Sequence, residues 1–222
     1  MSVEELVDDL RAQADRDLPP AATPDVGIIM GSDSDLEVMA GAHEALDRLG
    51  FAEQTDYGDP PEGRFSYETY VVSAHRTPDL MYAYAETAAD RGIEVVIAGA
   101  GGKSADLPNM TASVAYPLPV IGVPVQEKSV DSVVGMPTGA PITAVDAGKS
   151  YNAALSAVQI LARAHPDLIE RLDGLRAERR AGVAEVSRAL HDRGLEGFRA
   201  WAAGDDETGG SDGSGGDAAD GG

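Results

Sequence analysis

Short apolar runs that end in glycine, serine or alanine alternate with helical patterns along the middle of this chain. Four runs have the length and composition of buried strands, at residues 26–30, 70–73, 94–98 and 120–123. Helical patterns lie between them, at residues 34–49, 78–91 and 104–115. Strands that alternate with helices form a parallel sheet, because each helix returns the chain to the edge where the next strand starts. We therefore predict an α/β fold of three layers, a parallel sheet with helices on both faces.

This α/β domain is expected to span residues 25–164. A fifth strand is predicted at residues 142–145, before helices at residues 148–164 and 166–192. The segment at residues 56–69 breaks the alternation with two prolines and two glycines, and we expect an inserted loop or hairpin there.

Three further segments flank the predicted domain. Residues 1–24 form an N-terminal helical extension, with a short polar helix at residues 3–16 that ends before a group of prolines. Residues 165–203 form a C-terminal helical segment. Residues 204–222 contain only glycine, serine, threonine, alanine and acids, which cannot offset the entropy of ordering, so we predict a disordered acidic tail.

Acidic side chains outnumber basic ones by 38 to 17, which gives a formal net charge of −21. Nucleic acids and anionic membranes are bound largely through clusters of lysine and arginine, so we predict neither partner. No apolar run approaches the roughly 20 residues of a membrane-spanning helix. Because the first residues lack the basic and apolar pattern of a signal peptide, we expect a cytoplasmic protein.

The acidic balance resembles that of cytosolic proteins from halophilic organisms, with an ordinary acidic protein as the alternative. Hydrated carboxylates keep a protein soluble in concentrated salt, whereas at low ionic strength their repulsion destabilises the compact state. The sequence has no cysteine, which excludes disulfides, thiolate metal ligands and a cysteine nucleophile. Its histidines and carboxylates also lack the spacing of metal ligands, so we predict no metal.

Ligands of parallel sheets bind beyond the carboxyl ends of the strands, so the turn after each strand is a candidate site. The first turn, residues 31–35, is Gly-Ser-Asp-Ser-Asp. Backbone N–H groups at the start of the next helix favour an anion such as phosphate, and Asp35 is suited to accept hydrogen bonds from sugar hydroxyls. Plain helix capping by the serines and aspartates is the alternative.

The second turn, residues 73–78, is Ser-Ala-His-Arg-Thr-Pro. The planar guanidinium of Arg76 matches phosphate, and the imidazole of His75 titrates near neutral pH, so the pair suggests phosphate binding beside proton transfer. In the alternative, Arg76 pairs with an acid and His75 bonds a loop carbonyl. The other histidines lie in polar stretches and are expected to be solvated: His43, His165 and His191.

The third turn, residues 98–104, is Ala-Gly-Ala-Gly-Gly-Lys-Ser, and its glycines allow backbone N–H groups to approach an anion. Its last three residues resemble the end of a nucleoside-triphosphate loop, but that loop requires glycine where Ile97 stands. The dinucleotide fingerprint fails at Ser104, where it requires glycine or alanine. The turn therefore indicates neither ATP nor NAD.

Taken together, these turns and a fourth resemble the N5-carboxyaminoimidazole ribonucleotide mutase family, also called the catalytic subunit of phosphoribosylaminoimidazole carboxylase. The fourth motif, Pro-Val-Ile-Gly-Val-Pro-Val-Gln, occupies residues 119–126. The four motifs occur in the family's order at compatible spacing, and the resemblance covers about residues 26–164. Four ordered motifs are far more specific than any one of them.

The resemblance implies a flavodoxin-like (Rossmann-like) fold and a step of purine biosynthesis. The implied reaction converts N5-carboxyaminoimidazole ribonucleotide to 4-carboxy-5-aminoimidazole ribonucleotide by transferring a carboxylate through carbon dioxide. It also implies no metal or organic cofactor, and a homo-oligomer that is commonly an octamer. His75 is implied to be the catalytic acid/base, and the implied substrate-binding residues are Ser32, Asp35, Ser73, Arg76, Gly99, Gly101, Gly102, Lys103 and Ser104.

The chain departs from the mutase pattern after the glycine turn. Mutases usually have His-Leu-Pro-Gly-Met there, whereas residues 103–110 are Lys-Ser-Ala-Asp-Leu-Pro-Asn-Met, one residue longer and without the histidine. This is closer to the Gly-Arg-Ser-Asn segment of related carboxylases that take carbon dioxide directly, although those usually have lysine in place of Arg76. We favour the mutase, with the direct carboxylase and a non-catalytic flavodoxin-like module that binds a phosphorylated ligand as alternatives.

Overall fold

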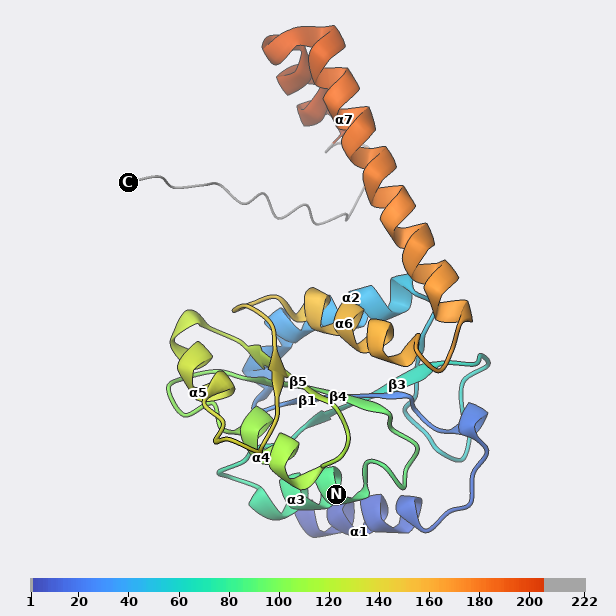
Figure 1. Cartoon of the computed structure of the whole chain (residues 1–222), viewed down its shortest axis with the longest axis vertical. Helices are drawn as coiled ribbons and strands as arrows, with labels where there is room; N and C mark the ends of the chain where they lie inside the picture. The colour runs from blue at the N-terminus through green and yellow to red at the C-terminus, as the bar shows by residue number, and fades with distance from the viewer. Residues whose placement is uncertain (1, 206–222) are drawn as a thin grey trace. The chain divides into compact units, whose positions relative to one another are not determined.

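The computed structural model describes residues 2–205, which contain one parallel six-stranded sheet (Figure 1). The strands pair in the order β2-β3-β1-β4-β5-β6, and every neighbouring pair is parallel. The predicted α/β fold is therefore confirmed. The strands are β1 (Val26–Met30), β2 (Ala52–Glu53), β3 (Ser66–Val71), β4 (Val95–Ala100), β5 (Val120–Pro124) and β6 (Thr143–Ala144).

Helices cover both faces of the sheet, as predicted. The α-helices of the described residues are α1 (Val3–Ala14), α2 (Leu36–Arg48), α3 (Pro78–Thr87), α4 (Leu107–Val114), α5 (Val130–Val134), α6 (Ser150–Leu161) and α7 (Asp167–Asp205). On one face α2 packs against α6, and on the other α3 packs between α1 and α4 (Figure 1). Among these described helices, none is both long and apolar enough to cross a membrane.

The two central strands, β1 and β4, are buried along their whole length. A parallel strand with helices on both of its faces must be apolar on both sides, which explains why the sequence shows continuous apolar runs here rather than alternation. Burial of these side chains, roughly 2 kcal/mol for each large aliphatic one, fixes the strand ends from which the turns emerge.

The first helix begins with a capping box. The Ser2 side chain accepts a hydrogen bond from the Glu5 N–H at 3.2 Å, and the Glu5 carboxylate accepts one from the Ser2 N–H at 2.6 Å. Val7 and Leu10 are buried where α1 packs on α3. The helix predicted at residues 3–16 is thus confirmed, and its apolar side belongs to the core.

The predicted insertion at residues 56–69 is wrong for its last four residues, because β3 already begins at Ser66. The strand is hard to recognise because polar side chains, Ser66 and Glu68, are buried in it. Its partner at the edge of the sheet is the short strand β2, and the two run parallel, which excludes a hairpin.

A buried ion pair anchors the loop before β3. Arg91 Nη1 donates to Glu68 Oε1 at 2.6 Å and to the Tyr57 hydroxyl at 2.9 Å. The Tyr57 hydroxyl donates in turn to Glu68 Oε2 at 3.0 Å. All three residues are buried, so the network joins the loop, β3 and the segment after α3.

The long C-terminal helix α7 is interrupted at Gly194, where φ is 65°. Such a left-handed backbone suits glycine, which has no Cβ. The chain divides into two compact units, Met1–Asp173 and Gly174–Gly222, so the first unit extends past the predicted boundary at residue 165. Leu168 is buried and Arg171 donates to the Leu49 carbonyl, which ties the start of α7 to the first unit. Residues 206–222 of the predicted tail lie outside the described residues.

Candidate active site

The turns after β1, β3, β4 and β5 line a single cavity of about 370 Å³ at the carboxyl edge of the sheet. Parallel strands bring their carboxyl ends to one edge, so these turns meet although they are far apart in sequence. Seven of the ten predicted site residues line the cavity: Ser32, Asp35, Ser73, His75, Gly101, Gly102 and Ser104. The other residues that line it are Gly31, Ser34, Ala74, Ala100, Asp106, Leu107, Gln126 and Lys128.

Ser32 both caps a short helical turn and lines the cavity, so the two interpretations of the first turn are compatible. Its hydroxyl accepts a hydrogen bond from the Ser34 N–H at 3.4 Å and donates one to Asp33 Oδ1 at 2.9 Å. A short 3-10 turn, Asp33–Asp35, then leads directly into α2. The hydroxyl therefore lies at the start of a helix and at the wall of the cavity.

Asp35 is the most buried charged group of the cavity, with 7% of its surface exposed. A Cβ on Gly31 would stand 3.5 Å from one carboxylate oxygen, and a Cβ on Gly101 would stand 3.2 Å from the other. The contact at Gly101 would be tighter than usual, whereas the one at Gly31 would be ordinary, so Gly101 is the glycine that leaves room for the carboxylate. Burial raises the pKa of Asp35, while backbone N–H groups of Ser32 and Gly31 oppose that increase.

His75 contacts two acceptors that come from the turn after β4. Its Nε2 lies 3.2 Å from Asp106 Oδ2 and 3.4 Å from the Ser104 carbonyl oxygen. The alternative that His75 bonds a loop carbonyl therefore holds in part, and the ring still lines the cavity. Its side chain is 61% exposed, so packing contributes little to its orientation.

Arg76 lies beside the cavity and does not line it. Its Nη2 donates to the Gly31 carbonyl at 2.9 Å, and its Nε donates to the Ser73 hydroxyl at 3.3 Å. These bonds hold the guanidinium next to the first turn, where its positive charge lowers the pKa of Asp33, after the larger effects of hydrogen bonds from Ser32 and Ser34.

Two other predicted residues, Gly99 and Lys103, also lie outside the cavity lining. A Cβ on Gly99 would collide with the thioether of Met39 on α2, so this glycine is required for packing of helix against strand. Lys103 is exposed. The glycine at position 102 has φ of 83°, the left-handed conformation that lets the loop turn at the edge of the cavity.

Four polar residues of the cavity are not among the predicted site residues: Ser34, Asp106, Gln126 and Lys128. Gln126 ends the fourth motif, and Lys128 follows it two residues later. Because the chain has so few lysines, the position of Lys128 just after a strand end is the signal that points to a site cation. Asp106 lies in the segment at residues 103–110 that departs from the mutase pattern, and this departure is the signal that points to it.

Two of the three histidines expected to be solvated are not. His43 bonds the Thr69 hydroxyl at 2.9 Å, and its burial lowers its pKa. His165 has 18% of its side chain exposed and lies between Arg64 and Glu94. These contacts join residues that are far apart in sequence, so the polarity of the neighbouring sequence does not predict them. His191 is exposed, as expected.

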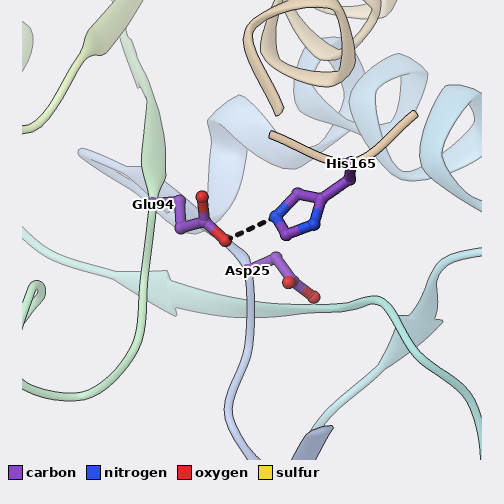
Figure 2. Close-up of side chains that lie close together, drawn as sticks. All are labelled: Asp25, Glu94 and His165. Carbon is purple, nitrogen blue, oxygen red and sulfur yellow. Dashed lines mark hydrogen bonds and ion pairs between the residues drawn. The ribbon is translucent and has the colours of Figure 1, made fainter. Parts of the chain in front are cut away.

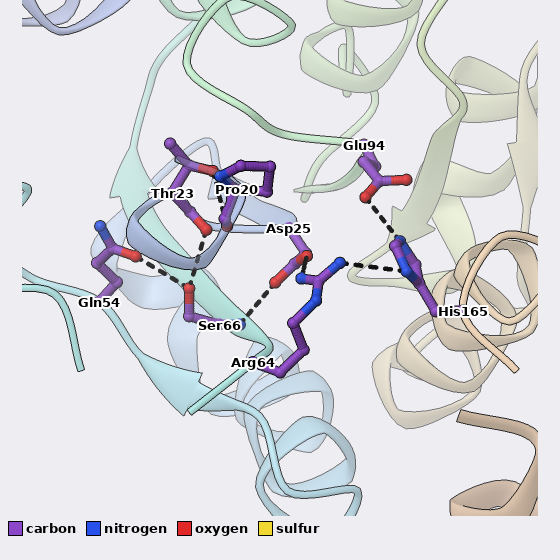
Figure 3. A network of polar contacts seen from close by, with 8 residues as sticks. All are labelled: Pro20, Thr23, Asp25, Gln54, Arg64, Ser66, Glu94 and His165. Atoms are coloured by element: carbon purple, nitrogen blue, oxygen red, sulfur yellow. Dashed lines mark hydrogen bonds and ion pairs between the residues drawn. The ribbon is translucent and has the colours of Figure 1, made fainter. Parts of the chain in front are cut away.

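The His165 contacts belong to a polar cluster at the opposite, amino edge of the sheet (Figure 2). Asp25 and Glu94 directly precede β1 and β4, and with His165 they place ligand-type atoms within 4.8 Å of one another. Figure 3 shows Arg64 inside this cluster, donating to Asp25 Oδ1 and to His165 Nδ1, each at 3.2 Å.

The position of Arg64 argues against a metal centre there. Because guanidinium only donates, His165 Nδ1 must accept, and the ring hydrogen lies on Nε2, which donates to Glu94 at 3.0 Å. A metal on Nε2 would move that hydrogen to Nδ1, where it would face the Arg64 donor. The guanidinium already supplies the positive charge of this cluster.

Comparison with known proteins identifies relatives of this chain. The sequence model of the family described as AIR carboxylase matches residues 25–181. The N5-carboxyaminoimidazole ribonucleotide mutase of Bacillus subtilis is 47% identical over 175 residues, which cover 75% of this chain and 98% of that protein. The Aquifex aeolicus protein of the same name is 50% identical over 156 residues, 68% of this chain and 84% of its own length.

Relatives with the carboxylase name are longer proteins. The phosphoribosylaminoimidazole carboxylase of Schizosaccharomyces pombe is 42% identical over 187 residues, 82% of this chain and 31% of that protein. Among solved structures, Treponema denticola PurE has the same fold, with a TM-score of 0.60 at 23% identity over 74% of this chain and 97% of its own. The match to the family model and the identity to these relatives show that the chain belongs to the AIR carboxylase family.

Proposed function

We propose that this protein acts in purine biosynthesis as an N5-carboxyaminoimidazole ribonucleotide mutase. One observation carries the proposal: Ser32, Asp35 and His75, which come from two different turns, line one cavity at the carboxyl edge of the sheet. The two relatives that bear the mutase name match over 98% and 84% of their own length, which supports the assignment.

The cavity offers separate groups for the parts of a ribonucleotide. The Ser32 hydroxyl and the start of α2 suit the phosphate, and Lys128 supplies a positive charge in the same cavity. Asp35 suits the ribose hydroxyls, because a carboxylate only accepts hydrogen bonds. Arg76, held beside the first turn, is a predicted further phosphate ligand.

His75 is suited to carry the proton that the reaction moves. The exocyclic nitrogen gains a proton as its bond to the carboxylate carbon breaks and carbon dioxide is released. The imidazole ring carbon of the substrate then bonds the carbon dioxide and loses its hydrogen. One proton is taken up and one is released, so a single acid/base balances the reaction, and carbon dioxide kept beside the ring reacts by proximity.

Replacing His75→Asn tests this assignment. We expect kcat to fall by about 10²–10⁴-fold, the usual contribution of a general acid/base, with substrate affinity changed less than about threefold. His191→Asn, at an exposed position, is the matched control and should retain turnover. Normal turnover by His75→Asn contradicts the acid/base role, and tight binding without turnover in the unchanged protein supports a binding module instead.

Direct carboxylation of aminoimidazole ribonucleotide is the second candidate, favoured by the Lys103-Ser104 segment and by the relatives named carboxylase. The two are separated by offering each substrate to the protein in molar potassium chloride. The mutase should use the N-carboxy compound rapidly and carboxylate the other only when bicarbonate is abundant. The reverse preference would assign the direct carboxylase.

We further infer a homo-oligomer, as the family resemblance implies, and a cytoplasmic location. Large apolar side chains stand exposed along α7, including Val183, Val186, Leu190 and Leu195. Exposed apolar rows of this kind suit contacts between copies of a chain. The number of copies, an octamer by resemblance, stays a prediction.

A further inference from the structure

Asp106 occupies a helix-capping position without capping the helix. It is the N-cap residue of α4, yet its side chain makes no hydrogen bond to the first turn of that helix. Aspartate at such a position ordinarily accepts from a backbone N–H of that turn. The carboxylate is instead directed to His75, with Oδ2 3.2 Å from Nε2.

A second side chain bonds the other oxygen of this carboxylate. The Ser132 hydroxyl donates to Asp106 Oδ1 at 3.2 Å, and Asn109 donates to the Ser132 carbonyl at 2.6 Å. Asp106 is therefore held on both sides, by His75 from the turn after β3 and by Ser132 on α5. Because the His75 side chain is largely exposed, these bonds rather than packing set its orientation.

The contacts of His75 also determine which nitrogen carries its hydrogen in the neutral ring. An ionised carboxylate and a backbone carbonyl only accept hydrogen bonds, and both lie near Nε2. The hydrogen is thus on Nε2, and Nδ1 is the nitrogen with a free electron pair.

We propose that Asp106 is a positioning residue for His75, which holds the ring through Nε2–H so that Nδ1 exchanges the proton with the substrate. This inference rests on the proposed function. In the reaction, Nδ1 takes the hydrogen from the substrate ring carbon after the new carbon–carbon bond forms. The imidazolium then bears two hydrogens, and the Asp106 carboxylate stabilises its charge until Nδ1 donates the proton to the exocyclic nitrogen of the next substrate molecule, as the bond from that nitrogen to its carboxylate carbon breaks.

Substitution of Asp106 separates positioning from substrate binding. We expect Asp106→Ala to lower kcat about tenfold or more while KM changes less than about threefold. Asp106→Asn keeps an acceptor oxygen without the charge and should retain intermediate turnover. Asp131→Ala removes an exposed carboxylate nearby and should match the unchanged protein. A structural role would instead raise KM or lower the unfolding temperature together with kcat.

Methylated histidines at position 75 test the nitrogen directly. Nδ1-methylhistidine blocks the proposed proton-transfer atom and should be as inactive as His75→Asn. Nε2-methylhistidine leaves Nδ1 free and loses the Nε2–H contacts to Asp106 and to the Ser104 carbonyl, so its kcat should resemble that of Asp106→Ala or fall somewhat below it. Activity with the Nδ1 methyl group and none with the Nε2 methyl group would overturn the inference.

The failure of this inference is distinguishable from failure of the proposed function. If the unchanged protein does not interconvert the two carboxylated ribonucleotides, the function is wrong. If it does and requires His75, but Asp106→Ala turns over at the normal rate, only the role of Asp106 is wrong.

Discussion

Asp25 is 3% exposed, and desolvation raises its pKa to about 6 in spite of the Ser66 N–H and Arg64. Between about pH 4 and pH 6 the folded protein thus holds a proton that the unfolded chain has released, so this residue's contribution to stability is greatest at low pH and is lost as pH rises through 6. The free energy of unfolding should fall by ~2 kcal/mol relative to Asp25→Asn between pH 4 and pH 7. Denaturant unfolding of both proteins at each pH measures this change.

The control for this prediction is Asp59→Asn, an exposed carboxylate whose removal should leave the difference from the unchanged protein constant over the same range. A constant difference for Asp25→Asn as well would show that Asp25 is ionised to the same extent in the folded and unfolded chains.

Some residues of the candidate site can be predicted from the sequence and others cannot. His75 and Ser32 could be proposed because they follow strand ends, and strand ends follow from apolar runs. Asp106 and Lys128 lie beyond short irregular turns, whose course depends on contacts such as the Ser132 bond rather than on local pattern. Arg76 follows a strand end as well, but it lies beside the cavity, and the direction of its guanidinium depends on the Gly31 carbonyl, 45 residues away.

At the scale of elements, the buried Arg91–Glu68 pair joins β3 to the segment that follows α3. Arg91→Met should cost about 3–5 kcal/mol of unfolding free energy, because it leaves the Glu68 carboxylate buried without its charge partner. Arg91→Met combined with Glu68→Gln should recover much of that loss. Arg48→Met, at the exposed pair with Glu44, should cost less than about 1 kcal/mol.

Equal losses of unfolding free energy at Arg91 and Arg48 in chemical denaturation would show that burial of the first pair has no energetic consequence.

The same network explains which elements the sequence could predict. β1 has only apolar or glycine residues, and its predicted bounds, residues 26–30, match the structure. β3 buries Glu68 and Ser66, and it begins at residue 66, four residues before the apolar run from which the strand is predicted. A buried charge is recognisable only when its partner is known, and Arg91 is 23 residues away.

At the scale of the whole molecule, the net charge of −21 makes stability depend on salt. We expect the unfolding temperature to rise steeply between dilute buffer and molar potassium chloride, because screening reduces repulsion among carboxylates. If the protein forms the homo-oligomer that we propose, light scattering in the same titration should show its mass retained in high salt and decreased in dilute buffer. Equal stability and equal mass in both solutions would contradict the salt requirement.

The collision that a side chain at position 99 would make with Met39 affects how variants of this enzyme are to be interpreted. A genetic screen that selects for purine auxotrophy would recover Gly99 and His75 together, although one supports a helix and the other faces the cavity. Selection for growth with and without an overproduced chaperone would sort them, since folding aids rescue only damaged packing. If residues were assigned to the active site from the growth phenotype alone, residues that only support packing, such as Gly99, would be included by mistake.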